Sequence, residues 1–191
     1  MFWRGVLGYL PVNVVQGVVG LLTIVTFTRL LDPSQFGAYA LGFAVMSLVH
    51  TAFFTWNEAA MARFWAAETV EGRSAALAAG LYRTWLRLLL VLPPIALAAW
   101  FWPMPEPLRL AVLCGLAATL PRTAVKLIQE RQRAAGEVGR AASLDIIQTL
   151  GAFGIGAGCA WAGAGGAAPL IGLGAAALLC LAWRGPGEFR M

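Results

Sequence analysis

Six apolar segments, separated by short polar gaps, occupy most of this sequence. Each is close to the length of about 20 residues that a helix needs to cross the hydrocarbon core of a bilayer. Only 12% of the residues are charged, whereas a soluble domain carries about 25%, so the chain cannot cover a large water-facing surface. We therefore expect an all-α fold, a polytopic membrane bundle of six transmembrane helices that forms a single domain over residues 1–191.

The segment boundaries carry recognisable helix signals. The spans are expected at about residues 5–28, 36–56, 83–102, 108–128, 141–161 and 167–183. Asp32 can cap a helix, Pro33 suits its first position, and Gln35 stands where the partner in a capping box belongs. These residues predict that the second helix begins near Pro33. The pair Pro93-Pro94 predicts a kink within the third span.

The positions of the basic residues predict the orientation in the membrane. If the N-terminus is cytoplasmic, only Arg29 and Arg109 of the 14 Lys and Arg residues fall in outside loops. Cytoplasmic loops are enriched in Lys and Arg, so both termini are expected in the cytoplasm. The segment from Arg184 to Met191 is expected to form a tail beyond the last span. Because the basic residues flank apolar segments instead of forming one patch, the net charge of +5 does not indicate nucleic-acid binding.

Signatures of enzymes and of metal sites are missing from the sequence. His50 is the sole histidine, the three cysteines lie singly inside apolar segments, and the acidic residues are scattered. No phosphate-binding loop, GxSxG or HExxH motif occurs. We expect no catalytic residues, no cofactor and no metal. The glycines between Gly151 and Gly158 lie within a span, where small residues let helices approach closely, so we expect them to serve helix packing.

Polar side chains inside the spans are the remaining candidates for function. Charged groups at membrane depth are costly and usually face the bundle interior or water. Arg63, at the end of the second helix, and Arg83 and Arg87, one turn apart on the third, allow two interpretations. They either mark the cytoplasmic membrane interface or line a basic vestibule that opens inward.

Two pairs of polar residues have a spacing of three, which puts both members on one helix face. These pairs are Asn13 with Gln16 and Asp145 with Gln148. We expect the first pair to form interhelical hydrogen bonds. Asp145 is expected to form a structural ion pair with Arg140 or Arg122.

One segment resembles a known family of membrane transporters. Residues 28–40, TRLLDPSQFGAYA, are similar to the pattern T-R-L-L-x-P-x-x-[FY]-G-x-[YF] found between the first two spans of polysaccharide flippases. These are the O-antigen and exopolysaccharide transporters of the multidrug/oligosaccharidyl-lipid/polysaccharide exporter superfamily. Residues 59–64, AAMARF, resemble a second family segment, a-x-x-R-[FY], and the polar residues 129–133 stand where the family has its loop between the fourth and fifth helices.

The resemblance implies a flippase lobe that translocates a lipid-linked oligosaccharide across the bacterial inner membrane during polysaccharide biosynthesis. The substrate carries a pyrophosphate, which needs a wet cationic cavity. The residues expected to contact it are Arg63, Arg83, Arg87, Arg122 and Lys126.

The chain departs from the family in having one six-helix half, whereas such transporters contain two halves around the cavity. We therefore expect a second half to be supplied by another copy or by a separate chain. Two alternatives remain, a small non-transporting membrane subunit and a lipid-processing membrane enzyme of cell-envelope glycan synthesis.

Overall fold

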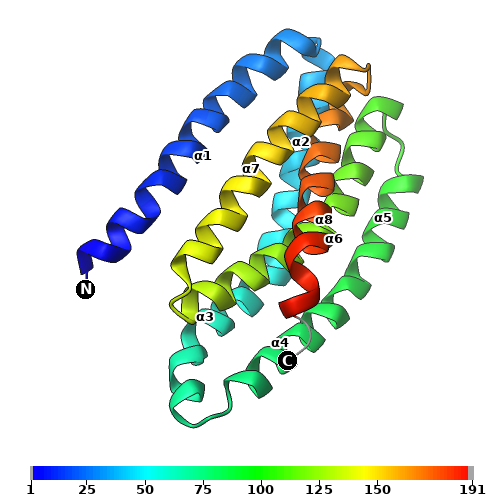
Figure 1. Ribbon diagram of the computed structural model, residues 1–191. Helices are drawn as coiled ribbons and strands as arrows, with labels where there is room; N and C mark the ends of the chain where they lie inside the picture. The colour runs from blue at the N-terminus through cyan, green and yellow to red at the C-terminus, as the bar shows by residue number, and fades with distance from the viewer. Residues whose placement is uncertain (1, 189–191) are drawn as a thin grey trace.

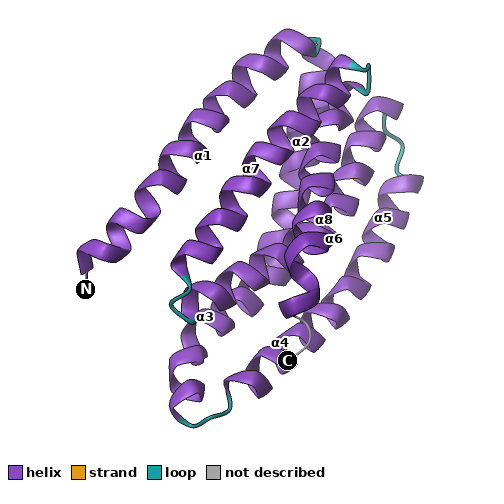
Figure 2. Cartoon of the chain, viewed as in Figure 1, coloured by secondary structure: helices purple, strands orange, loops and turns teal. Residues whose placement is uncertain are grey.

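The computed structural model describes residues 2–188, with side chains for residues 12–184, and throughout this range the elements are helices joined by short turns (Figures 1 and 2). The α-helices are α1 (Phe2–Leu30), α2 (Pro33–Val49), α3 (Thr55–Val70), α4 (Ser74–Leu88), α5 (Leu92–Phe101), α6 (Glu106–Ala134), α7 (Val138–Trp161) and α8 (Ala168–Glu188). Three short helices join some of them: the π-helical η1 (His50–Phe54) and the 3₁₀ helices η2 (Leu89–Val91) and η3 (Gly165–Ala167).

Six helical segments within the described residues are long and apolar enough to cross a membrane. They are Val12–Leu30, Pro33–Val70, Ser74–Phe101, Glu106–Ala134, Val138–Trp161 and Gly165–Arg184. Each corresponds to one of the expected spans, so the predicted all-helical bundle is confirmed.

The turn between α1 and α2 contains the predicted capping box. Asp32 Oδ1 accepts a hydrogen bond from the Gln35 backbone N–H at 2.9 Å, and Gln35 Oε1 accepts one from the Asp32 N–H at 3.3 Å. The hydrogen bonds from the Gln35 backbone and the Ser34 side chain lower the pKa of Asp32 below its usual value. Pro33 occupies the first turn of α2, as expected.

Two spans are interrupted without being broken. In the second, the π-helical η1 separates α2 from α3, and the His50 Nε2 atom lies 2.8 Å from the Glu58 Oε1 atom across it. No pattern in the sequence predicts this π-helical turn. In the third, where a kink was expected, the 3₁₀ turn η2 lies directly before Pro93 and Pro94 in the first turn of α5.

Two segments that were expected to lie outside the helices are helical. Helix α6 continues to Ala134, so residues 129–133 extend the helix instead of belonging to a loop. Helix α8 continues to Glu188, so residues 184–188 of the expected tail are helical. The rest of that expected tail, residues 189–191, lies outside the described residues.

Helix α6 occupies the centre of the bundle and packs against α2, α3, α7 and α8. Helix α1 lies along α7, while α4 and α5 lie on the opposite side of the molecule (Figure 1). Glycines permit the closest helix crossings. A Cβ atom on Gly115 of α6 would lie 2.8 Å from the carbonyl oxygen of Gly42 on α2, and one on Gly172 of α8 would lie 2.6 Å from the backbone nitrogen of Gly156 on α7. The expected packing role is thus confirmed for Gly156.

Candidate functional site

A cavity of about 470 Å³ lies among α1, α2, α6, α7 and α8. Its polar lining comprises Gln16 and Thr23 of α1, Tyr39 of α2, Arg122 and Lys126 of α6, and Asp145, Gln148 and Thr149 of α7. Its apolar lining includes Val19, Phe27, Phe43, Phe153 and Leu173. The cavity therefore offers charged and apolar surfaces side by side within the membrane-spanning part of the molecule.

Arg122 is the charged residue of this cavity that lacks an ionic partner. It stands four residues before Lys126, so both side chains project from one face of α6. Its guanidinium carbon lies 5.9 Å from the centre of the Phe43 ring. Its Nη1 atom is buried and has no hydrogen-bond partner among the described residues. Glu58 and Asp145 influence it electrostatically, but no carboxylate of the described residues lies within ion-pair distance.

The carboxylate of Asp145, by contrast, contacts three neighbouring side chains. Its Oδ2 atom accepts hydrogen bonds from Gln16 Nε2 at 2.9 Å and from Arg133 Nη2 at 3.3 Å, and its Oδ1 atom lies 3.8 Å from Lys126 Nζ. The residue is 5% exposed. A buried carboxylate is stable only when it is paired and hydrogen-bonded, and these three groups supply that pairing.

The ion pairs beside the cavity leave Arg122 out. Asp145 contacts Lys126 and Arg133, and Glu130 lies 2.5 Å from Arg133. Glu58 and Asp145 act on the Arg122 guanidinium electrostatically from beyond ion-pair distance. Unpaired buried cations of this kind are stabilised by an anion or by water.

Gln148 presents a second unpartnered polar atom to the cavity. The residue is buried, and its Oε1 atom has no hydrogen-bond partner among the described side chains and backbone groups. Buried amide groups normally form hydrogen bonds, and those that do not mark places for water or a ligand. Arg122 and Gln148 therefore offer one unused donor and one unused acceptor in the same cavity.

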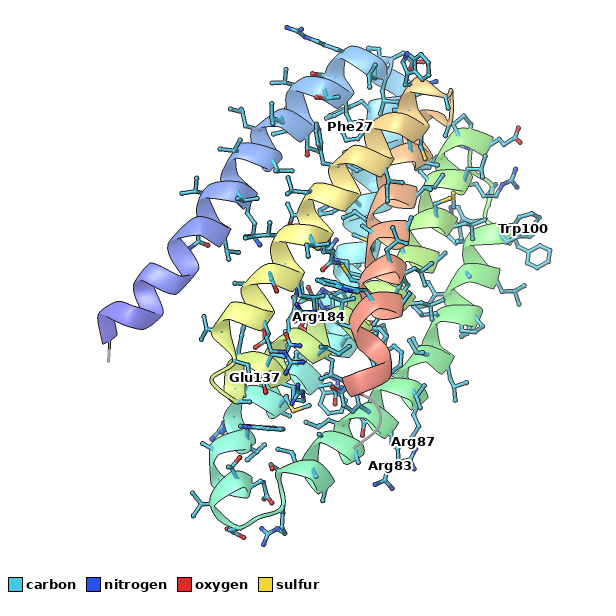
Figure 3. The ribbon with its side chains drawn as sticks, viewed as in Figure 1. Phe27, Arg83, Arg87, Trp100, Glu137 and Arg184 are labelled. Atoms are coloured by element: carbon cyan, nitrogen blue, oxygen red, sulfur yellow. The ribbon has the colours of Figure 1, made fainter. Side chains whose placement is uncertain are left out.

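The five cations that were expected to form one site are divided between two regions of the structure. Arg122 and Lys126 line the cavity. Arg63 is exposed on α3, with its guanidinium carbon 5.9 Å from the centre of the Phe64 ring. Arg83 and Arg87 are exposed on the outer side of α4, away from the bundle (Figure 3). The vestibule suggested for Arg63, Arg83 and Arg87 is therefore not part of this cavity.

The expected structural ion pair of Asp145 is present, but with other partners. Lys126 and Arg133 take the place proposed for Arg122 or Arg140, and Arg140 lies 2.6 Å from Glu137. The reason is the length of α6, which carries Arg133 alongside α7. The predicted interhelical role of Gln16 is confirmed by its hydrogen bond to Asp145.

A set of buried polar residues near the C-terminal end of α6 was not predicted from the sequence. Gln129 and Gln132 are 0% exposed, and Arg131 is nearly as buried. Both polar side-chain atoms of Gln129 lack hydrogen-bond partners among the described residues. Helical spacing places Gln129 on the same face as Lys126 and Arg133, one turn from each. Such residues look solvated in a sequence, and nothing in their spacing indicates burial.

The comparisons with known proteins leave the site to be interpreted from its own chemistry. No family model, curated protein or solved structure matches this chain. The geometry shows an amphipathic cavity lined by one guanidinium that forms no ion pair with the described residues. Such a cavity can hold a molecule that combines an anionic group with an apolar portion.

Proposed function

We propose that this chain is a transporter lobe that binds a lipid-linked oligosaccharide and moves it across the bacterial inner membrane in polysaccharide biosynthesis. The observation that carries the proposal is the Arg122 guanidinium, which lines the cavity without an ionic partner. A guanidinium presents paired donors that match phosphate oxygens, so the pyrophosphate of such a lipid is a suitable ligand.

The rest of the cavity supports an amphiphilic ligand. Lys126 adds a second cation one turn from Arg122, and Gln148 adds an unused acceptor for a hydroxyl group. The apolar lining from Phe27, Phe43 and neighbouring side chains suits the first isoprene units of the lipid. Asp145 keeps Lys126 and Arg133 within the bundle while leaving Arg122 available.

The proposal includes an orientation and a partner. In this proposal both chain ends lie in the cytoplasm, which the Lys and Arg distribution supports. A second six-helix half, from another copy or a separate chain, would complete the translocation pathway, as the resemblance implies. Arg63, Arg83 and Arg87 have no role in the proposed pyrophosphate site.

The test is a binding titration with the purified full chain in detergent, using a polyprenyl diphosphate and the uncharged polyprenol of equal length. The wild type is expected to prefer the diphosphate. Arg122→Gln should weaken diphosphate binding at least about tenfold, because a charge-assisted hydrogen bond contributes about 1.5–3 kcal/mol. Arg122→Lys should recover part of the loss. Arg109→Gln is the control, since Arg109 lies beside Trp100 at 5.8 Å, outside the cavity.

Reconstitution in liposomes together with the second half would then distinguish the three functional classes. Protection of the lipid-linked glycan from an external glycan-modifying reagent, lost in Arg122→Gln, supports transport. Conversion of the lipid to a new chemical species would show an enzyme. Equal binding of diphosphate and polyprenol, without transport or conversion, would favour a non-transporting subunit and overturn the proposal.

A further inference from the structure

Arg83 and Arg87 form a second cationic feature, separate from the cavity. They stand one turn apart on α4, both are exposed, and both extend from its outer side (Figure 3). The other side of α4 is held in the bundle by Ala78 and Tyr82, which are buried. The helix thus has one face fixed in the core and one face that carries two guanidinium groups outward.

The nearby carboxylates are already engaged elsewhere. In the α3–α4 turn, Arg73 Nε lies 2.9 Å from Glu68 Oε2, and Arg73 also pairs with Glu71. These contacts, led by the hydrogen bond with Glu68, raise the pKa of Arg73 above its usual value. Arg83 donates from Nε to the backbone oxygen of Ala79 at 3.1 Å. Within the described part of the chain neither Arg83 nor Arg87 has an ion pair, so their terminal donors point outward unused.

The depth of these arginines follows from helix length. Arg83 precedes Phe101 by 18 positions, which at 1.5 Å per residue is about 27 Å. This distance is close to the hydrocarbon thickness of about 30 Å. Exposed Trp100 and Trp102 mark one boundary of the layer, so Arg83 lies near the other. Arg87 lies one turn deeper and can extend its side chain to the same boundary.

The surface between these two boundaries is apolar. Leu86, between the two arginines, is 57% exposed, and Leu90, three residues beyond Arg87, is 73% exposed. A membrane phospholipid has a matching arrangement, with a phosphate at the boundary and acyl chains below it. Arginine side chains near a membrane surface attract anionic lipids.

We propose that Arg83 and Arg87 together bind the phosphate of an anionic phospholipid whose acyl chains lie along Leu86 and Leu90. Two guanidinium groups one turn apart can hold the oxygens of a single phosphate from two sides. The site faces bulk lipid and does not line the cavity, so its ligand is a structural membrane lipid and not the transported molecule.

The test is native mass spectrometry of the full chain released from mixed micelles of phosphatidylglycerol and phosphatidylcholine. The wild type should retain phosphatidylglycerol in preference to phosphatidylcholine. The double substitution Arg83→Gln/Arg87→Gln should lower that preference about 25-fold, taking about fivefold for each arginine at a membrane surface. Arg109→Gln is the matched control, because Arg109 is also partly exposed beside a tryptophan, near the opposite boundary.

Unchanged phosphatidylglycerol preference in the double variant, or equal retention of both lipids by the wild type, would overturn the proposal. Helical circular dichroism of the variant checks folding, and both side chains are exposed, so the fold should be kept. The ligand and the variants differ from those of the diphosphate titration. Failure of the cavity proposal would therefore leave this result unaffected.

Discussion

Arg122 and Asp145 line the same cavity and differ in what surrounds their charges. Asp145 has two cations and an amide donor within reach, whereas Arg122 has an aromatic ring and an unused Nη1 donor. A charge near the centre of a membrane-spanning helix costs about 2.5–3.5 kcal/mol on insertion scales. Asp145 offsets this cost with contacts inside the bundle, and Arg122 does so only when water or an anion is present. The first residue is therefore structural and the second is suited to a ligand.

The structural role of Asp145 predicts a specific pattern of stability changes. Asp145→Asn keeps the shape of the side chain but leaves Lys126 and Arg133 without their shared carboxylate. Breaking a buried pair costs about 3–5 kcal/mol, and since each cation is about a quarter exposed, we expect the lower end of that range. Adding Lys126→Met should restore part of the loss. Unfolding in mixed micelles with increasing SDS would measure both effects.

The control for this measurement is Glu71→Gln, which removes the pair with Arg73, whose two side chains are both exposed. Exposed pairs contribute about 0–1 kcal/mol, so this change should be nearly neutral. If Asp145→Asn were no more destabilising than Glu71→Gln, the ion pairs of Asp145 would not support the cavity wall.

At the scale of single helices, the sequence predicts the features that are determined by neighbouring residues, such as the position and the start of a helix. The length of each apolar segment predicts where a membrane span lies. Asp32 and Gln35 predict the start of α2, because a capping box depends only on residues that are close in the sequence. The π-helical η1 was not predicted, because apolar residues such as Phe53 and Phe54 read equally well as α-helix. Its hydrogen-bond register is visible only in the structure.

The candidate site was predictable in part, for a related reason. Arg122 and Lys126 could be identified because both lie on the amphipathic half of α6. Arg63 and Arg83 were grouped with them because the charge bias predicts all four on the cytoplasmic side. That bias predicts the end of a helix at which a residue lies, but not the face from which it projects. Which cations meet in a cavity depends on how helices pack, and this information is spread over the whole chain.

Helix packing at the α7–α8 crossing gives a prediction at the same scale. A methyl group on Gly172 would collide with the carbonyl oxygen of Ala152 and lie 2.7 Å from the Gly156 Cα atom. Because backbone atoms cannot move aside as a flexible side chain can, Gly172→Ala should destabilise the bundle by about 1–3 kcal/mol. Gly154→Ala on α7 should be neutral or slightly stabilising, because a Cβ atom added at Gly154 would meet no atom of a neighbouring helix within 4 Å. The same SDS titration would compare them, and equal stabilities would contradict the packing shown here.

At the scale of the whole molecule, the two proposed anion sites lie on different faces and serve different lipids. The cavity lies among α1, α2, α6, α7 and α8, and the Arg83–Arg87 site lies on the outer side of α4, opposite α1 (Figures 1 and 3). Headgroup contacts on α4 would hold that side of the bundle at a fixed depth. The helices around the cavity would then be the ones that move against a second half during transport.

The final prediction concerns that second half. Arg122 has no ion-pair partner within a membrane-spanning helix. The charge bias predicts one orientation for each copy, so two copies would insert parallel to each other. Parallel halves related by an axis along the membrane normal are known among transporters. We expect the chain to associate in bilayers with another copy or with a separate six-helix chain, and to be inactive in transport alone. Photobleaching of singly labelled chains in liposomes at low protein density would show two steps for a pair of copies. Single-step bleaching combined with transport by the chain alone would rule out any need for a second half.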